Sequence, residues 1–440
     1  PTLSLLVKRE QERLSFVPKA YLTLTGTFSY DNESYNGKWI DPGFRKNSKK
    51  PELKKDRIWD PRSARAIVEK CTGKPATVSE TTKESSQIAP QLYDLTSLQR
   101  EANSRFGFSA KNTLGIAQAL YERHKVLTYP RTDSRHLPED YLKTAGSIVD
   151  CQTNWQFGSY ASTILDKGYI RPDKRVFNNN KVSDHHAIIP TIRLPGGLSE
   201  PEMKIYQMVV QRFLAVFFPP ARYLNTTRLS IVEEETFLTE GKILKDPGWK
   251  VVYLGNRPEK GQGILGSIPN GTAVVCTEVI EEKKETKPPP RFSEATLLSA
   301  MENSGKLLDD DELAEAMKER GLGTPATRAA IIEKLLKEKY LVREGKELAP
   351  TGKAFDLLSL LEAMKIDVLA SPEMTGEWEY KLNRILKGEM TRSQFMGEIR
   401  SLTEQITERI KNFDDRQTRQ TAPFSPVDGA RYFETPTSYN

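Results

Sequence analysis

The stretch Tyr129-Pro130-Arg131-Thr132-Asp133-Ser134 carries the most specific chemistry in this chain of 440 residues. It overlaps a short apolar run, Val126 to Tyr129, that predicts a buried strand. Pro130 is predicted to end this strand because proline cannot donate a ladder hydrogen bond. Residues i and i+2 of an extended segment lie on the same face, so Tyr129 and Arg131 are predicted to address one phosphate.

A phenol and a guanidinium at this spacing suit attack on a phosphodiester. A free phenol has a pKa of about 10, so it is a poor nucleophile at neutral pH unless a cation stabilises its oxyanion. Arg131 can do so, and its planar fork can also hold two phosphate oxygens as charge grows at phosphorus. The competing interpretation is structural. The chain has 16 tyrosines, most tyrosines pack in cores or interfaces, and Arg-Thr-Asp-Ser is also an ordinary polar turn.

Further stretches accompany the hexapeptide in a fixed order. Upstream lie Tyr93-Asp94-Leu95-Thr96-Ser97-Leu98-Gln99-Arg100 and Arg105-Phe106-Gly107-Phe108-Ser109-Ala110. Downstream lie Ser183-Asp184-His185-His186-Ala187-Ile188-Ile189-Pro190-Thr191 and Gly321-Leu322-Gly323-Thr324-Pro325-Ala326-Thr327-Arg328. Together with the hexapeptide they resemble the motifs of type IA DNA topoisomerases, in the form typical of the topoisomerase III branch. The resemblance runs from residue 1 to about residue 412.

The resemblance implies a multidomain α+β fold. This fold is the type IA topoisomerase toroid or arch, with two winged-helix, CAP-like domains and a discontinuous β-rich arch domain. The expected parts are an N-terminal helix of the C-terminal helical domain (1–18), the β-rich arch domain (19–87 and 221–288), a CAP-like domain carrying the catalytic tyrosine (88–220), a helical, winged-helix domain that binds single-stranded DNA (289–412) and an extended tail (413–440).

Strand and loop signals fit this division. Alternating apolar and threonine residues predict strands at three places, which are Tyr21 to Phe28, Val78 to Thr82 and Leu229 to Val232. Between the first two, Lys38 to Asp60 is polar and rich in lysine, which predicts a solvated loop, with nucleic-acid contact as the alternative. The charge run Glu281 to Lys287, followed by three prolines, predicts a linker.

Helix signals mark the two other blocks. Thr96-Ser97-Leu98-Gln99 is a capping-box pattern that predicts the start of a helix, which Gly107 ends, and Ser109 is predicted to cap the next helix. Thr324-Pro325 predicts a helix start of the N-cap and first-turn proline type. Leu341 to Leu348 then predicts two short strands around a glycine turn, the wing of a winged-helix unit.

Roles for individual residues follow from the resemblance. Tyr129 is the expected nucleophile, and Arg131 and His185 are expected to stabilise the phosphoryl charge. Without the family, His185 would be interpreted as an ordinary loop histidine, and His186 is expected to be its noncatalytic neighbour. A phosphate can also sit on the glycine loop ahead of a helix, or that loop can simply cap the helix. The expected DNA contacts are Thr132, Ser134, Gly323, Thr324, Thr327 and Arg328.

The resemblance also implies Mg²⁺, held in the family by an Asp-x-Asp cluster and a glutamate of a preceding Toprim domain. This sequence contains no equivalent of that Asp-x-Asp cluster and glutamate. We therefore expect a fragment that lacks the Toprim domain and binds no metal itself. The acidic residues between 309 and 315 are instead expected to complement the dipole of a helix, Glu312 to Lys318. Phe424 to Gly429 resembles the opening of a zinc module, but Ser425 stands where a cysteine is needed.

Composition limits the classes of protein and the compartments that fit this chain. The chain has 65 Lys and Arg against 59 Asp and Glu, a net charge of +6 and a pI near 8.9, which is compatible with DNA binding without requiring it. No apolar run reaches the roughly 18 residues of a membrane span, and no leader is visible, so a cytoplasmic protein is expected. Cys71, Cys151 and Cys276 form no Cys-x-x-Cys pair, which indicates a reducing compartment and no zinc site.

Together these features predict a topoisomerase III-like isomerase. It would cleave one DNA strand through a 5′-phosphotyrosyl intermediate, pass a strand and religate without ATP, relaxing negatively supercoiled DNA or decatenating DNA. The fragment itself would bind single-stranded DNA and relax supercoils poorly or not at all. Expected partners are single-stranded, negatively supercoiled or catenated DNA and a helicase, with the chain a monomer. Two alternatives stay open, a noncatalytic single-strand-binding module and a tyrosine relaxase or recombinase.

Overall fold

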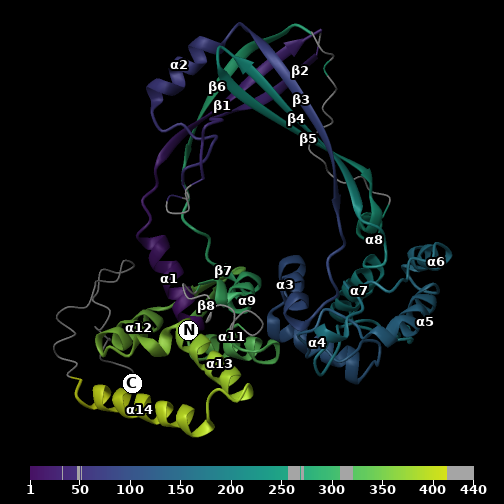
Figure 1. Ribbon diagram of the computed structural model, residues 1–440, viewed down its shortest axis with the longest axis vertical. Helices are drawn as coiled ribbons and strands as arrows, with labels where there is room; N and C mark the ends of the chain where they lie inside the picture. Colours follow the sequence, from purple (N-terminus) through teal and green to yellow (C-terminus); the bar gives the residue numbers. More distant parts are fainter. Residues whose placement is uncertain are drawn as a thin grey trace.

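The computed structural model describes residues 1–31, 33–46, 50, 52–255, 268, 272–307 and 321–413. The chain runs as a ring, with a β-barrel at one end, two helical bodies at the other and extended segments between them (Figure 1). Several predictions lie outside the described residues. They are the acidic stretch 309–315, the helix Glu312 to Lys318, the stretch Phe424 to Gly429 and, apart from residue 413, the tail 413–440.

The barrel consists of six antiparallel strands that close in the order β1-β2-β5-β4-β3-β6. The strands are β1 (Ala20–Tyr30), β2 (Glu33–Ile40), β3 (Lys74–Gln87), β4 (Ala221–Val232), β5 (Glu235–Asp246) and β6 (Val274–Glu285). Strands β3 and β4 pair along most of their length although the tyrosine-bearing body separates them in sequence. The expected discontinuous β-rich arch is therefore present.

Two facing glycines make room for the barrel core. Gly26 of β1 pairs with Gly37 of β2, and a Cβ atom at either position would lie 3.0–3.1 Å from ring atoms of Phe28 and 3.1 Å from side-chain atoms of Phe237. These two phenylalanine rings are fully buried and pack edge to face at 5.4 Å. The absence of side chains at the glycine pair thus lets two large rings fill the interior.

Two sequence predictions for this region need correction. The charge run from Glu281 was predicted to be a linker, but residues up to Glu285 belong to β6 and pair with β1. Its charged side chains are exposed, so backbone pairing places them on the solvated outer face without cost to the core. A helix that was not predicted, α2 (Pro61–Cys71), follows the lysine-rich loop, with Asp60 as its N-cap.

The tyrosine-bearing body is helical and has the largest apolar core. Its elements are α3 (Leu95–Phe106), α4 (Ala110–Glu122), η1 (Glu139–Tyr141), α5 (Leu142–Gln152), α6 (Gly158–Asp166), η2 (Asn179–Lys181), α7 (Glu200–Ala215), η3 (Gly248–Lys250) and α8 (Val251–Leu254). The N-cap of helix α3 lies two residues earlier than predicted, because Asp94, and not Thr96, caps the helix and accepts from Ser97 N at 2.6 Å. Gly107 ends α3 at a φ of 72°, and Ser109 caps α4, both as predicted.

The second helical body contains a three-stranded sheet in the order β7-β9-β8. Its elements are α1 (Thr2–Leu14), β7 (Phe292–Ser293), α9 (Glu294–Glu302), η4 (Ser304–Leu307), α11 (Pro325–Lys337), β8 (Leu341–Glu344), β9 (Glu347–Pro350), α12 (Gly352–Ala363), η5 (Asp367–Ala370), α13 (Pro372–Leu386) and α14 (Arg392–Lys411). The predicted hairpin around Gly345 is present, and α1 packs its apolar face into this body.

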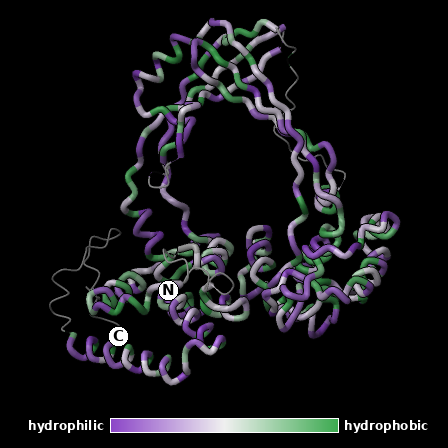
Figure 2. Tube along the Cα trace, in the orientation of Figure 1, coloured by the Kyte–Doolittle hydropathy of each residue, from purple (hydrophilic) through white to green (hydrophobic). Residues whose placement is uncertain are grey.

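Hydrophobic segments along the trace are short and are interrupted by hydrophilic ones (Figure 2). Within the described part of the chain, no helix combines the length and the apolar character that a membrane span requires.

Candidate active site

The segment that carries Tyr129 runs antiparallel to the segment that follows His185. Thr128 N donates to Ile189 O at 3.0 Å, and a single isolated bridge joins the two segments. The predicted strand Val126 to Tyr129 is thus an extended segment with minimal pairing. The prolines in both segments explain this, since they remove donors that a longer ladder would need.

Two of the three predicted catalytic groups lie side by side. The rings of Tyr129 and His185 are 4.3 Å apart, centroid to centroid, at an interplanar angle of 45°. Tyr121 of α4 packs against Tyr129 from another direction, edge to face at 5.5 Å. Tyr129 is half-buried and His185 is exposed, so the phenol is fixed by neighbouring rings while the imidazole stays accessible.

Arg131 is held by a residue that the sequence did not indicate. With its amide oxygen turned toward the guanidinium, Gln118 of α4 accepts from Arg131 Nη2 at 3.1 Å and from Nε at 3.3 Å. Arg131 forms no ion pair with any carboxylate in the described ranges. Its charge therefore stays available for an anion, while a neutral partner fixes the side chain. No local motif marks Gln118, because the fold alone brings it to Arg131.

Thr132 and Ser134 fix the hexapeptide, residues 129–134, through buried hydrogen bonds. Thr132 Oγ1 donates to His185 O at 2.9 Å and accepts from Ser134 N at 3.0 Å, while Ser134 Oγ donates to Lys181 O at 2.8 Å. Their side chains are only 3% and 5% exposed. Both residues were expected to contact DNA directly, but this burial fits residues that tie the hexapeptide to the loop carrying His185.

His186 is half-buried, whereas its neighbour His185 is exposed. The His186 ring packs on Tyr141 at 4.7 Å, and its Nδ1 lies 2.8 Å from Ala187 O. Burial lowers the pKa of His186 below the ordinary value, so this imidazole is mainly neutral at physiological pH. The expectation that His186 is a structural neighbour agrees with this geometry.

The glycine loop ahead of α11 packs against the end of α9. Gly321 and Gly323 have φ values of 65° and 69°, and a Cβ at Gly321 would lie 2.3 Å from Met301 O. Only glycine allows this approach. Thr324 and Thr327 are exposed, and Thr324 N donates to Thr327 Oγ1 at 2.9 Å. The predicted helix start at Thr324 is therefore present, and both threonines take part in the cap.

Arg328 lies inside the protein and joins the two helical bodies. It is 3% exposed, its Nη1 donates to Thr96 Oγ1 at 2.8 Å, and its Nε donates to Leu322 O at 3.3 Å. Burial lowers the pKa of this guanidinium. Arg328 was expected to contact DNA, but the structure places it between α11 and the N-terminal end of α3.

A cluster of charges reinforces this contact between the bodies. Glu302 of α9 binds Arg135 Nη2 at 2.8 Å and Arg100 Nη1 at 3.4 Å, and Arg135 Nε also binds Asp94 at 2.7 Å. We call these four residues the α3–α9 joint. Because Arg135 directly follows the hexapeptide, the joint connects the tyrosine loop to the opposite helical body.

A pocket of about 580 Å³ opens beside Tyr129. Two exposed cations, Lys125 and Arg193, line it together with the Tyr121 ring. The Thr191 hydroxyl donates to Lys125 O at 2.8 Å and accepts from Arg193 N at 3.2 Å, so one hydroxyl positions both cationic segments. This pocket has the charge and the aromatic surface that a nucleotide next to the tyrosine requires.

The described residues contain no group of three or more His, Cys, Asp or Glu side chains placed to hold a metal ion. The donor set around Tyr129 consists of imidazole, guanidinium, amide and hydroxyl groups, which does not match the oxygen ligands that Mg²⁺ prefers. The residues present therefore do not fit a magnesium site.

Comparisons with known proteins agree with this geometry. Residues 1–397 match the family model described as DNA topoisomerase, and the chain belongs to this family. The chain is 39% identical over 429 residues to DNA topoisomerase 3 of Bacillus cereus, covering 94% of this chain and 56% of that protein. It is 36% identical over 423 residues to DNA topoisomerase 3 of Bacillus subtilis, with the same coverage of both chains.

A solved structure of full-length topoisomerase I from Thermotoga maritima superposes with a TM-score of 0.63 at 24% identity, covering 94% of this chain and 62% of that one. This likeness shows the type IA topoisomerase fold. The chain spans about half the length of the curated relatives that it matches.

Proposed function

We propose that this chain supplies the nucleophile and the gate of a topoisomerase III-like, type IA reaction on single-stranded DNA. The observation that carries the proposal is the placement of Tyr129. The phenol lies against the accessible imidazole of His185, and two residues further along Arg131 is fixed by a neutral amide. We propose that one phosphate group contacts all three side chains.

In the proposed reaction, Tyr129 Oη forms a bond to phosphorus as the bond from phosphorus to the 3′ oxygen breaks. The phenolic proton passes to solvent water, and the departing oxygen takes up a proton from solvent water to become a 3′ hydroxyl. The guanidinium of Arg131 and a ring N–H of His185 stabilise the charge on the nonbridging oxygens. Religation is the reverse step, and because one ester replaces another, ATP is not needed.

Mg²⁺ is the proposed cofactor, and its carboxylate ligands would come from outside the residues described. When bound, it would supply further charge neutralisation at the phosphate. The proposed substrates are single-stranded DNA and negatively supercoiled or catenated DNA. A helicase is the proposed partner, and a cytoplasmic monomer the proposed state.

Thr132, Ser134 and Arg328 are proposed to act by holding the loop and the joint between the bodies. Gly323, Thr324 and Thr327 remain proposed DNA contacts, because the two threonine side chains are exposed at the positive end of α11 and backbone N–H groups there can face a phosphate.

Substitution of the tyrosine tests the proposal. In a protein of the relatives' full length that contains these residues, Tyr129→Phe should abolish the covalent adduct with an end-labelled oligonucleotide while single-strand binding persists. A Tyr121→Phe variant is the matched control, since it alters the phenol of the adjacent ring, and it should retain the adduct. An adduct that survives in Tyr129→Phe would exclude the proposed nucleophile.

A further inference from the structure

A pocket of about 470 Å³ lies where the barrel joins the tyrosine-bearing body. Its walls come from three segments of the chain. They are the residues that directly follow β3, the residues between α6 and η2, and the residues that join α7 to β4. We call this cavity the junction pocket. It is formed by two of the chain connections on which the arch stands.

Arg175 fastens the three segments to one another. Its Nη1 donates to Ala89 O at 2.6 Å, and its Nη2 donates to Val216 O at 3.3 Å. Asp173 accepts from Arg175 N at 2.8 Å and lies 3.7 Å from Arg175 Nε. The charge of Arg175 is thus used inside the wall, and the pocket keeps its shape without a ligand.

The floor of the junction pocket is aromatic. Phe217 and Phe218 are 7% and 9% exposed, and the half-buried Tyr169 ring packs edge to face on Phe218 at 5.7 Å. At the rim, the Ile88 side chain extends this apolar surface and is 58% exposed. An apolar side chain of a partner that covered this surface would remove it from water, which is favourable.

Two cations at the rim are not neutralised by neighbours. Arg171 and Lys174 are exposed, and neither forms an ion pair with a carboxylate in the described ranges. Arg171 donates from Nε to Gly168 O at 3.1 Å. Asp173, the acidic residue of the lining, already binds Arg175. The rim therefore presents positive charge beside an apolar floor.

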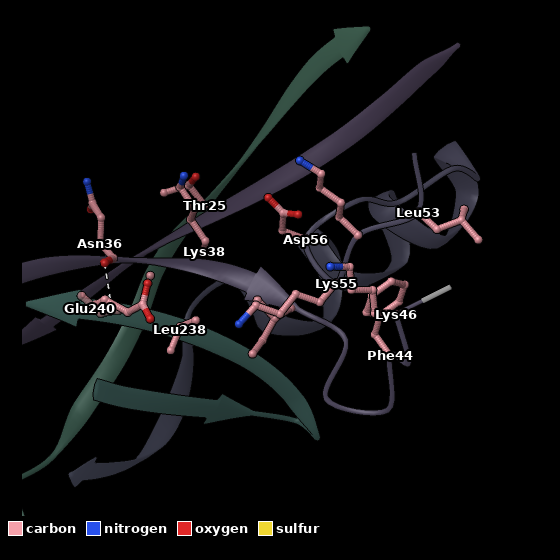
Figure 3. A pocket seen from close by; sticks show the side chains of 14 residues that line it. Thr25, Asn36, Lys38, Phe44, Lys46, Leu53, Lys55, Asp56, Leu238 and Glu240 are labelled. Carbon is pink, nitrogen blue, oxygen red and sulfur yellow. Dashed lines mark hydrogen bonds between the residues drawn. The ribbon is translucent and has the colours of Figure 1, made fainter. Parts of the chain in front are cut away.

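The larger groove on the barrel, of about 1070 Å³, lacks this combination. Figure 3 shows lysines around it together with the carboxylates of Asp56 and Glu240. The loop on one side, which the sequence predicted to be solvated, is tied to the barrel, since Asp41 N donates to Lys55 O at 2.7 Å. The described lining has one aromatic ring, that of Phe44, against three in the junction pocket.

We propose that the junction pocket docks an acidic segment of another protein through one apolar anchor side chain. The anchor fills the pocket, where a single buried side chain can supply most of the affinity. Acidic residues next to the anchor pair with Arg171 and Lys174, and this complementarity selects the partner. The proposal goes beyond the proposed function and does not depend on it.

A nucleic acid matches the junction pocket less well than an acidic protein segment. Two cations beside an apolar floor do not form the continuous positive groove that follows a phosphate backbone. Helix α6, which leads into the rim, also lies on the outer side of the tyrosine-bearing body, away from the opening of the ring (Figure 1).

Binding of a defined peptide tests the proposal. The probe is a fluorescein-labelled synthetic peptide in which two glutamates flank a phenylalanine on each side, and its binding to the 440-residue chain is measured by anisotropy. One control peptide has alanine in place of the phenylalanine, and another has lysines in place of the glutamates. We expect saturable binding of the probe and about tenfold or more weaker binding of both controls. Equal binding of the three peptides, or none, would overturn the proposal.

Variants of the rim test where the probe binds. The double variant Arg171→Gln, Lys174→Gln should weaken probe binding about tenfold, and Ile88→Ser should weaken it as well. The control Lys111→Gln, Lys143→Gln removes the same charge from two lysines that are exposed outside the pocket and should leave the affinity nearly unchanged. Equal affinities of the two double variants would contradict the proposed site. Circular dichroism checks that all variants fold.

Photocrosslinking locates the anchor. With benzoylphenylalanine in place of the phenylalanine, the probe should crosslink to the tryptic peptides 168–174 and 213–222, which carry the rim and the floor. Crosslinks confined to other peptides would contradict the proposal. An excess of oligothymidine should leave these crosslinks in place. Their loss would show that the rim binds nucleic acid, and the proposal would be wrong.

Discussion

At the scale of single residues, Tyr129 is surrounded by groups from separate segments of the chain. His185 comes from a loop more than fifty residues downstream, and Tyr121 from the preceding helix. The buried hydroxyl of Thr132 ties the tyrosine loop to the histidine loop. Under the proposed function, the Tyr129 phenol is thus positioned before a substrate arrives, which would lower the entropic part of the barrier.

Substitution of Gln118 tests whether the positioning of Arg131 matters. Gln118→Leu removes the acceptor that the described residues provide for Arg131, and hydrogen bonds to charged groups are worth about 1.5–3 kcal/mol. We expect the single-turnover cleavage rate to fall about tenfold or more, with oligonucleotide affinity nearly unchanged. Gln118→Glu keeps an acceptor and should retain more of the rate than Gln118→Leu. Equal loss in both variants, or loss of affinity alone, would contradict a positioning role.

The residues that the sequence did not resolve share one physical cause. Gln118 was missed, and the burial of Thr132, Ser134 and Arg328 was not foreseen, because a motif shows which residues accompany the chemistry but not which way they point. The burial of Arg328 depends on Thr96, which lies more than two hundred residues away. The adjacency of Tyr129 and His185 was accessible from the motif resemblance alone.

At the scale of elements, the α3–α9 joint holds two helical bodies together through Glu302, Arg100, Arg135 and Asp94. Glu302, Arg100 and Arg135 are partly exposed, between 24% and 38% by side chain, whereas Asp94 is buried at 5%. Partly exposed pairs of this kind contribute about 1 kcal/mol or less. The ion pairs of Glu302 are thus expected to add about 1 kcal/mol or less each to the contact between the two bodies.

Removal of Glu302 should loosen the contact. Glu302→Ala leaves Arg100 and Arg135 without their shared partner, and we expect opening of the joint to become about fivefold more frequent, equivalent to about 1 kcal/mol. Hydrogen exchange of the amides in α3 and α9 measures this change. Glu139→Ala, an exposed carboxylate with no ion pair among the described residues, is the control. Unchanged exchange in Glu302→Ala would show that the charges do not hold the joint.

Glu202 offers a pH-dependent test at the start of α7. Burial raises the pKa of its carboxyl, but hydrogen bonds from Ser199, His124 and Arg123 outweigh this effect and lower the pKa from 4.5 to about 2. The carboxylate therefore stabilises the fold above the unfolded pKa, and this contribution is lost as the pH falls toward 2.

Glu202→Gln should accordingly reduce stability at neutral pH by about 1–2 kcal/mol. The difference from the unsubstituted protein should shrink as the pH falls from about 4.5 to about 2. Denaturant unfolding at a series of pH values measures it. A difference that stays constant with pH would show that the hydrogen bonds, and not the charge, account for the loss.

Elements were predictable where local signals and tertiary contacts agree. Local chemistry alone predicts three features, which are the end of α3 at Gly107, the N-cap of α4 at Ser109 and the hairpin around Gly345. The start of α3 was displaced because Asp94 is the better cap, and the strand character of Glu281–Glu285 was hidden because pairing with β1 is a long-range contact. Helix α2 was missed because its capping signal, Asp60-Pro61, lies at the end of a lysine-rich loop.

At the scale of the whole molecule, the chain forms a ring in which the barrel, the joint and the tyrosine lie in different bodies (Figure 1). The barrel is closed and has no free edge, so it can act as a stiff end of the arch. The contacts between the helical bodies are local and partly polar. Under the proposed function, release of the joint is the route that we propose for opening of the ring.

The 440 residues by themselves should bind single-stranded DNA and fail to relax supercoils. This expectation rests on the proposal that the carboxylate ligands of Mg²⁺ lie outside the described residues. Anisotropy with oligothymidine and agarose-gel relaxation in Mg²⁺ measure the two properties. Robust magnesium-dependent relaxation by this chain alone would contradict the assignment of metal chemistry to residues outside those described.

The most direct test of the central claim is to map the covalent product. A protein of the relatives' full length containing these residues is incubated with a single-stranded oligonucleotide and Mg²⁺, denatured and digested, and the labelled peptide is identified by mass spectrometry. The account predicts one linkage, from the Tyr129 oxygen to the 5′ phosphate of the downstream fragment, with a free 3′ hydroxyl on the other fragment. A linkage to another residue, or through a 3′ phosphate, would contradict it.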